Sequence, residues 1–259
     1  MFTRAIVRPP ASNFGEGLTT ANLGQPDYQL ALKQHQAYCA ALERCGLTLT
    51  RLDPDPNYPD STFVEDVAIL TECCAILTRP GAPSRGGEVD SMRPIVAPFF
   101  PSLHEIVAPG TLDGGDVCQA GEHFFICVSE RTNRAGSEQL AEILSLSGHS
   151  STVVDIANNS SSASLLHLKS GVAYLGDHRL VITDPLSTRR EFAGYDPIRV
   201  HADEEYAANC VRVNDYVLVA SGHPRLENDL RELGYQIIAL DMTEFQKMDG
   251  GLSCLSLRF

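Results

Sequence analysis

A repeated pattern of two short apolar runs most strongly constrains how this chain of 259 residues can fold. Segments that start near Asp66, Asp116, Gly171 and Cys210 share this pattern. In each, a valine opens an apolar run, a polar turn follows, and a second apolar run comes next. A period of about 40–50 residues is typical of propellers and repeat arrays. The pattern therefore favours true repetition of one β-hairpin unit over the chance similarity that short hairpins often show.

A fifth unit begins at Cys254 and ends with the last residues of the chain, LSLRF. Its second strand is expected from residues 3–9, so that both ends of the chain enter one sheet. Helical patterns at about residues 27–45, 135–147 and 225–233 alternate with the hairpins, which indicates an α/β protein. We therefore predict one domain over residues 1–259, built as a closed ring of five ββαβ repeats.

Composition excludes several classes of partner. The formal net charge is −13, which argues against nucleic acid or an anionic membrane surface and is compatible with a small cationic ligand, although an acidic balance more often reflects only a solvated surface. No apolar run approaches membrane-spanning length, and the N-terminus lacks a signal-peptide pattern. The eight cysteines form no C-x-x-C, and no HExxH is present, so we expect no metal and a reducing cytoplasm.

The ring has a functional consequence, because equivalent positions of its repeats point toward one axis. The residues that lead into the first strand of each repeat are mostly acidic and include a histidine and a cysteine. They are Glu65, Asp66, Asp113, Asp116, His167, Asn209, Asp249 and Cys254. We therefore expect a concave, carboxylate-rich site with a Cys/His pair.

Cys254 is the candidate nucleophile of this site. It follows Asp249 and a pair of glycines and stands directly before an apolar run, where a ligand can approach the backbone closely. The alternative is that Cys254 is a buried structural cysteine of a strand. For Cys210, which lacks the preceding glycines and acid, this structural role is the preferred interpretation. His167 lies between leucines, as core histidines do, but its place in the repeat favours a proton shuttle.

Two acidic segments are expected in the same site as Cys254 and His167. Residues 60–66 place three acids beside Phe63, and planar guanidinium groups bind carboxylates in a bidentate fork. Asp113 lies in a Gly-rich acidic turn, and its functional interpretation is to orient His167. Solvated acidic turns are the alternative for both segments. From the residues alone, Arg85 and Arg131 either bind a substrate carboxylate or lie on the surface.

The motifs STFVEDVA, TLDGGDV, SERTN, HLKSG, EEYAANC and KMDGGLSCLSLRF, in this order, resemble those of the dimethylarginine dimethylaminohydrolase (dimethylargininase) family. That family belongs to the guanidine-modifying pentein superfamily, and the resemblance runs from the N-terminal segment to the last residue. It implies a five-bladed, pentein-type α/β propeller with pseudo-fivefold symmetry. It also implies hydrolysis of asymmetric dimethylarginine and monomethylarginine to citrulline and dimethylamine or methylamine by covalent cysteine catalysis, without a cofactor or metal.

The resemblance also implies the role of each site residue. Cys254 is the nucleophile, His167 the general acid and base, and Asp113 the third member of the triad, where some relatives carry Glu. The residues implied to contact the substrate are Leu18, Asp60, Phe63, Glu65, Asp66, Arg85, Arg131, Met248 and Asp249.

Among these contacts, Asp66 and Asp249 are expected to clamp the guanidinium group, and Arg85 and Arg131 to hold the α-carboxylate. Asp60 suits the α-amino end of the substrate. Leu18 matches a mobile lid, and Met248 is expected to contact substrate through its backbone. Residues 158–164 are expected to form a surface loop.

Two alternatives stay open. The first is a sister activity on the same scaffold, arginine deiminase or a citrulline-directed hydrolase, although deiminases of this kind typically carry a helical insertion for which the chain has no room. The second is a non-catalytic pentein that only binds a ligand. The expected partner is a small cationic arginine derivative. Oligomeric state is not readable, and a homodimer is one option because small propellers often dimerise.

Overall fold

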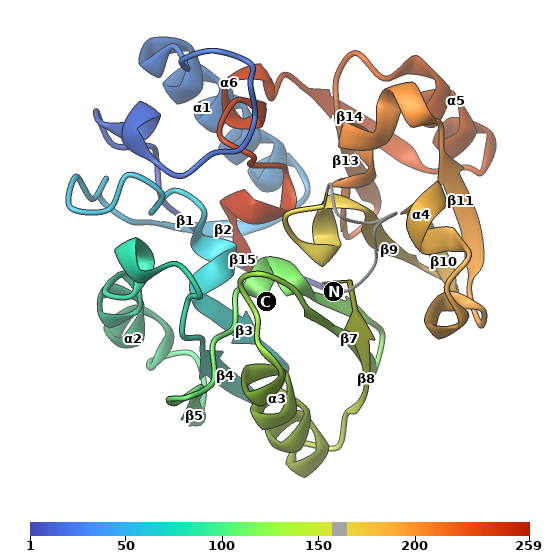
Figure 1. Cartoon of the computed structure of the whole chain (residues 1–259). Helices are drawn as coiled ribbons and strands as arrows, with labels where there is room; N and C mark the ends of the chain where they lie inside the picture. Colours follow the sequence, from blue (N-terminus) through green and yellow to red (C-terminus); the bar gives the residue numbers. More distant parts are fainter. Residues whose placement is uncertain (157–164) are drawn as a thin grey trace. The chain divides into compact units, whose positions relative to one another are not determined.

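The computed structural model describes residues 1–156 and 165–259 (Figure 1). The strands of these residues form five three-stranded sheets, in the orders β15-β1-β2, β3-β4-β5, β6-β7-β8, β11-β10-β9 and β12-β13-β14. The predicted α/β class and the five repeats are thus confirmed. The expected surface loop at residues 158–164 lies outside the described residues.

Each repeat is a hairpin followed by a helix and a third strand. The hairpins and third strands are β3 (Ala68–Leu70), β4 (Cys74–Leu77) and β5 (Ser102–Glu105); β6 (Val117–Ala120), β7 (His123–Val128) and β8 (Ser150–Asp155); β9 (Val172–Gly176), β10 (Arg179–Thr183) and β11 (Asp196–Val200); β12 (Val211–Val213), β13 (Tyr216–Ala220) and β14 (Gln236–Leu240). The third strands β5, β8 and β14 run parallel to the middle strands β4, β7 and β13. A parallel neighbour requires a crossover connection, which explains why a helix separates the last two strands of a repeat.

The fifth sheet joins the two ends of the chain, as the sequence predicted. Strand β15 (Leu257–Arg258) pairs antiparallel with β1 (Arg4–Val7), with Ala5 opposite Arg258 and Ile6 opposite Leu257. Strand β2 (Thr48–Arg51) pairs parallel with β1. The N-terminal strand therefore completes a repeat that the C-terminal residues begin.

Three helices lie within one residue of their predicted positions. They are α1 (Tyr28–Arg44), α3 (Arg134–Leu146) and α5 (Pro224–Glu232). The carboxylate of Asp27 caps α1 by accepting from the Leu30 N–H, and the amide oxygen of Asn133 caps α3 by accepting from the Gly136 N–H. Three further helices were not predicted from the sequence: α2 (Glu88–Val96), which contains Pro94, and the one-turn helices α4 (Asp184–Ser187) and α6 (Thr243–Gln246).

A short 3₁₀-helix precedes the first strand of every repeat. These turns are η2 (Val64–Val67) before β3, η4 (Gly114–Asp116) before β6, η5 (Leu168–Ser170) before β9, η7 (Ala202–Ala208) before β12 and η8 (Ser253–Leu255) before β15. Except for Asp249, which is separated from η8 by the short segment 250–252, the polar lead-in residues identified in the sequence lie on or directly beside these turns. The same local structure therefore presents a different chemical group in each repeat.

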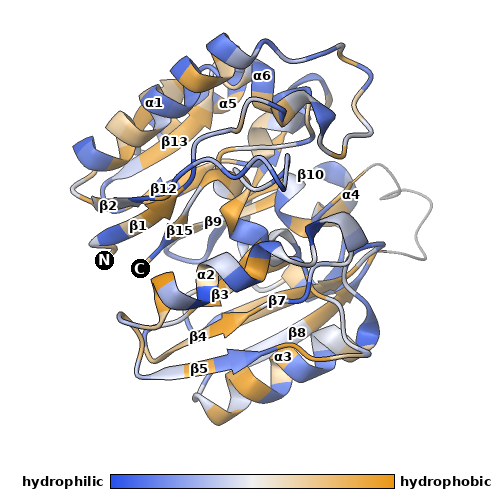
Figure 2. Ribbon diagram, turned by 90° about the vertical axis from the view of Figure 1, so that its left-hand side faces the viewer, coloured by the Kyte–Doolittle hydropathy of each residue, from blue (hydrophilic) through white to orange (hydrophobic). Residues whose placement is uncertain are grey.

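The chain divides into two compact units, residues 1–64 with 200–259 and residues 65–199, and each is described by itself. The core of the first unit includes Tyr38, Leu42 and Phe245, all buried. In the second unit, Phe124 and Ile126 belong to one of the apolar clusters. Figure 2 shows hydrophobic residues concentrated in strands such as β4, β7 and β13, while α1 and α3 alternate between hydrophobic and hydrophilic residues. The single domain over residues 1–259 stays a prediction.

No helix in the described part of the chain is both long and apolar enough to cross a membrane.

Removing residues 257–259 is expected to lower the free energy of unfolding by about 3 kcal/mol or more. The deletion exposes the surface that buried Leu257 covers and removes backbone hydrogen bonds between Phe259 and Arg4. Urea denaturation followed by circular dichroism measures the change. Removal of fully exposed Met1 is the control. Equal midpoints for the two truncated proteins would show that the terminal pairing contributes nothing.

Candidate active site

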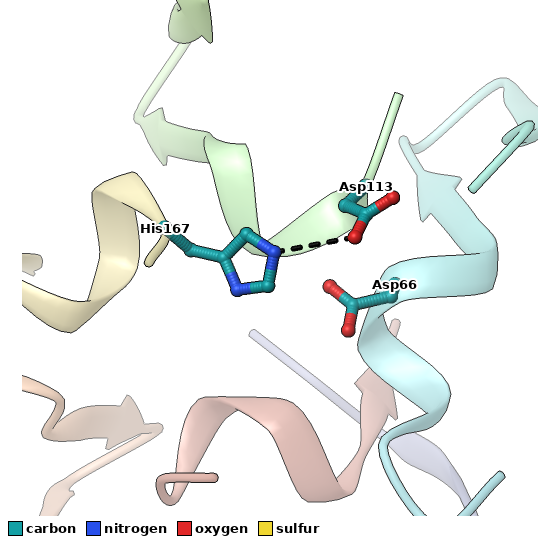
Figure 3. Close-up of side chains that lie close together, drawn as sticks. All are labelled: Asp66, Asp113 and His167. Atoms are coloured by element: carbon teal, nitrogen blue, oxygen red, sulfur yellow. Dashed lines mark hydrogen bonds and ion pairs between the residues drawn. The ribbon is translucent and has the colours of Figure 1, made fainter. Parts of the chain in front are cut away.

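In the unit of residues 65–199, the imidazole of His167 lies beside two buried carboxylates (Figure 3). His167 stands directly before η5, Asp113 directly before η4, and Asp66 within η2. The Nε2 atom of His167 lies 3.2 Å from Oδ2 of Asp113. One ligand atom from each of the three residues lies within 4.8 Å of the others. Three different repeats thus contribute to one cluster.

Fixed donors hold both carboxylates in place. Asp66 Oδ1 accepts the Gly115 N–H at 2.8 Å, and its Oδ2 lies 2.6 Å from Nη1 of Arg85. Asp113 Oδ1 accepts the Gly81 N–H at 2.8 Å, while its Oδ2 faces His167. Each of the four oxygens therefore has a partner within the chain. Although the spacing of the ligand atoms would allow a metal ion, these partners favour an ion-paired imidazolium.

The glycine pair at 114–115 allows this close approach. A Cβ atom on Gly115 would lie 2.9 Å from Cγ of His167, and one on Gly114 would lie 2.0 Å from the backbone oxygen of Glu65. Larger residues would push η4 away from η2 and from the imidazole. The Gly-Gly between Asp113 and Asp116 is therefore a packing requirement of the site.

The acids change the protonation of His167. Burial disfavours the imidazolium, but the charges of Asp66 and Asp116 and the hydrogen bond to Asp113 outweigh this effect and raise the pKa of His167 from 6.5 to about 9. Burial opposes ionisation of Asp66 as well, yet His167 and Arg85 together lower the pKa of this carboxyl. The histidine is therefore held as a cation at neutral pH.

Arg85 lies in a buried ion-pair network. Its guanidinium group contacts Asp66 and also Glu88, with Nε 2.9 Å from Oε1 and Nη2 2.8 Å from Oε2. Burial opposes the charge of Arg85, but these acids hold its pKa well above the ordinary value. The α-carboxylate role expected for Arg85 stays a prediction. Glu88 was not predicted as a site residue, because its position three residues after Arg85 is its only signal in the sequence.

Two further predicted residues lie in this unit. Glu65, in η2, pairs with Lys169 of η5 at 2.6 Å between Oε1 and Nζ. Arg131 is half-buried, and its backbone N–H donates to Ser129 Oγ at 3.0 Å. Their contacts with a substrate stay predictions.

In the unit of residues 1–64 and 200–259, Cys254 lies on η8 and is 9% exposed. Its Sγ accepts the Gly251 N–H at 3.5 Å, a contact that favours the thiolate. The side chain of Asn209 holds the adjacent residue, since Oδ1 accepts the Ser253 N–H at 2.8 Å and Nδ2 donates to Ser253 Oγ at 3.1 Å. The Tyr206 hydroxyl donates to the Gly250 oxygen at 2.9 Å. The loop that carries the thiol is thus fixed on both sides.

The segment predicted as a lid contacts two predicted substrate-binding acids of the same unit. The Leu18 N–H points at both oxygens of Asp60, at 3.0 and 3.2 Å. Asp249 Oδ2 accepts from the Thr20 N–H, the Thr20 hydroxyl and the Thr19 hydroxyl. Asp249 has a φ of 56°, a left-handed conformation that only a few non-glycine residues adopt. No sequence pattern predicted the contacts of the two threonines with Asp249.

Phe63 and Met248 complete the predicted set. Both are buried, and the ring of Phe63 packs against the backbone of Gly250, where a Cβ would lie only 2.2 Å from the ring. Met248 reaches the backbone of Gly17 with its terminal methyl group. The structure thus groups Leu18, Asp60, Phe63, Met248, Asp249 and Cys254 in one unit, and their roles toward a substrate stay predictions.

Comparison with known proteins identifies the class. The family model described as arginine deiminase matches residues 50–204. The chain is also similar to N(G),N(G)-dimethylarginine dimethylaminohydrolase of Pseudomonas aeruginosa, with 44% identity over the full length of both chains. It is 34% identical to the protein of the same name from Streptomyces coelicolor, over 98% of this chain and 96% of the relative.

Solved structures of related proteins have the same fold as this chain. A cysteine-to-serine mutant of the P. aeruginosa protein, complexed with citrulline, matches with a TM-score of 0.96 and 43% identity over all of both chains. The N-terminal domain of the cyanobacterial arginine dihydrolase ArgZ matches with a TM-score of 0.88 and 18% identity, over all of this chain and 97% of that one, which shows a shared fold. The chain belongs to the dimethylarginine dimethylaminohydrolase family.

The raised pKa of His167 predicts a pH dependence of stability. A pKa that is higher in the folded protein contributes stability that is complete below about 6.5 and is lost as the pH rises through about 9. The free energy of unfolding should therefore fall by on the order of 3 kcal/mol across this window. Asp116, whose burial raises its pKa to about 6, acts at lower pH. Burial also raises the pKa of the thiols of Cys39, Cys45, Cys118 and Cys127, and these lower the stability only as the pH approaches their ordinary value of 9.0.

Urea denaturation at half-unit steps between pH 6 and pH 8.5, below the range in which the thiols titrate, measures the main part of this dependence. His167→Gln should flatten the curve, whereas His104→Gln, a change on the partly exposed strand β5, should keep the wild-type slope. A wild-type curve that is already flat in this range would refute the charged, buried imidazole.

Proposed function

We propose that this chain hydrolyses Nω-methylated arginine, both asymmetric dimethylarginine and monomethylarginine, to citrulline and dimethylamine or methylamine. It is then a hydrolase of amidine C–N bonds. The observation that carries the proposal is the full-length match to N(G),N(G)-dimethylarginine dimethylaminohydrolase of P. aeruginosa, whose cysteine-to-serine mutant has been solved in complex with citrulline. A histidine-to-glycine variant of a dimethylarginine dimethylaminohydrolase, as an adduct with S-methyl-L-thiocitrulline, matches with a TM-score of 0.96 and 43% identity.

Cys254 is the proposed nucleophile. Its thiolate, favoured by the Gly251 N–H, attacks the guanidinium carbon and forms a C–S bond. His167 is the proposed general acid, and its charged state suits it to give a proton to the departing alkylamine. The C–N bond breaks, and a thiouronium intermediate remains on Cys254.

Water completes the reaction. The neutral His167 takes one proton from the attacking water, the oxygen bonds to the same carbon, and the C–S bond breaks to release citrulline and the thiolate. The second proton of the water leaves to solvent, where the released alkylamine takes it up. Asp113 holds the imidazole in position throughout, by the 3.2 Å contact with Nε2. No metal or organic cofactor takes part in this scheme.

The remaining predicted contacts orient the substrate. Asp66 and Asp249 are proposed to bind the guanidinium group, because a carboxylate has about four acceptor sites and can serve an internal donor and a ligand together. Asp60 is proposed to bind the α-amino group, and Arg85 and Arg131 the α-carboxylate. The remaining residues proposed to line the site are Leu18, Phe63, Glu65 and Met248.

Three broader proposals accompany this activity. The eight free thiols, seven of them buried, support a reducing, cytoplasmic location. One domain over residues 1–259 is supported by the full-length match to a single relative. A homodimer stays a prediction.

The test is citrulline release from asymmetric dimethylarginine, monomethylarginine and arginine, measured in parallel. Release from the methylated substrates should fall by at least about 10³-fold in Cys254→Ser, because a hydroxyl is a far poorer nucleophile than a thiolate. Cys210→Ser is the matched control, since Cys210 is also buried and directly precedes the first strand of a repeat.

Equal turnover of free arginine would assign the chain to the deiminase activity instead. No release from any substrate, combined with tight arginine binding, would assign it to the binding-only alternative.

A further inference from the structure

A third buried acid, Asp116, lies next to the His167–Asp113 pair and has no role in the scheme above. It is completely buried at the end of η4. Its Oδ2 accepts from the Ser129 hydroxyl at 2.6 Å and from the Thr132 hydroxyl at 2.7 Å. Its Oδ1 accepts the Leu168 N–H at 3.2 Å. Leu168 directly follows His167, so Asp116 holds the backbone from which the imidazole extends.

Thr132 extends this support to the other partner of the pair. While its hydroxyl donates to Asp116, the same oxygen accepts the Asp113 N–H at 3.1 Å. Thr132 is itself completely buried. One carboxylate and one hydroxyl therefore connect the backbone of Asp113 with that of His167, on the two sides of their side-chain contact.

Asp116 also acts on His167 through charge. The charged or titratable groups that face the imidazole are Asp66 from η2 and Asp113 and Asp116 from the η4 turn. Those that face Asp116 are His167, Asp113 and the thiol of Cys127 on β7. Burial raises the pKa of Asp116 to about 6, against the effects of His167 and the two hydroxyls, so it is mostly ionised above neutral pH.

We propose that Asp116, with Thr132, is a positioning residue that fixes both members of the His167–Asp113 pair and places a buried negative charge near the imidazole. This inference rests on the proposed function. It assigns Asp116 no contact with substrate.

Asp116→Asn tests the charge, since the amide has nearly the same shape and keeps an acceptor for the Leu168 N–H. The His167 ring is expected to titrate at least about one pH unit lower than in the wild type, because an opposite charge at short range typically shifts a pKa by about 1–3 units. Proton NMR of the histidine rings measures this directly, with the His167 signal assigned by its loss in His167→Gln. The alkaline limb of kcat/KM should move in the same direction.

Thr132 variants test the geometry and keep the inference testable if Asp116→Asn fails to fold. Thr132→Val removes the hydroxyl at constant size and should lower kcat at least about 10-fold with little change in KM, because it disturbs a catalytic pair rather than binding. Thr132→Ser keeps the hydroxyl and should restore most of the rate. Thermal denaturation checks that each variant is folded.

An unshifted His167 titration in folded Asp116→Asn, or a Thr132→Val rate equal to that of Thr132→Ser, would overturn the inference. Failure of the proposed function is distinguishable from this outcome. In that case the wild type releases no citrulline, while the NMR titration still reports whether Asp116 controls the imidazole.

Discussion

The charge balance around His167 is the constraint on which the rest of the site depends. An imidazolium removed from water is costly unless acids face it, and here Asp66, Asp113 and Asp116 reverse the effect of burial. Those acids are in turn held by Gly115, Gly81 and Leu168 backbone N–H groups and by Arg85. Fixed donors of this kind need no rearrangement when a proton moves, which is the condition for efficient acid–base chemistry.

The repeat explains how so many polar groups reach one place. Every first strand is preceded by a 3₁₀-turn, and the hairpin behind it is held by an antiparallel ladder of apolar residues. Because the ladder fixes the backbone, the side chains on the turns are free to differ. In the unit of residues 65–199, turn η2 carries Asp66, η4 ends in Asp116, and His167 directly precedes η5. Within each repeat, the hairpin thus supplies stability, and the turn before it supplies the functional side chain.

The hairpins, the terminal sheet and helices α1, α3 and α5 were predictable because each leaves a local periodic pattern. Helix α2 was not, since Pro94 and its charged residues interrupt an apolar stripe. In the site, the repeat located Asp66, Asp113 and His167 together. The repeat could not show that Arg85 pairs with Asp66 and Glu88, because tertiary packing decides which of several nearby acids a guanidinium group contacts. Thr20 matches no local sequence pattern, because its contact with Asp249 joins residues that are 229 positions apart in the sequence.

The buried cluster in the unit of residues 65–199 carries more negative than positive charge. Among the described residues, the carboxylates of Asp66, Asp113 and Asp116 lie with two buried cations, Arg85 and His167, while Glu65 pairs with Lys169. An uncompensated buried charge is unfavourable, so the cluster gains from a further cation. A guanidinium substrate supplies one, whereas citrulline, which is neutral at that end, does not. The same imbalance that binds a methylated arginine would therefore favour release of the product.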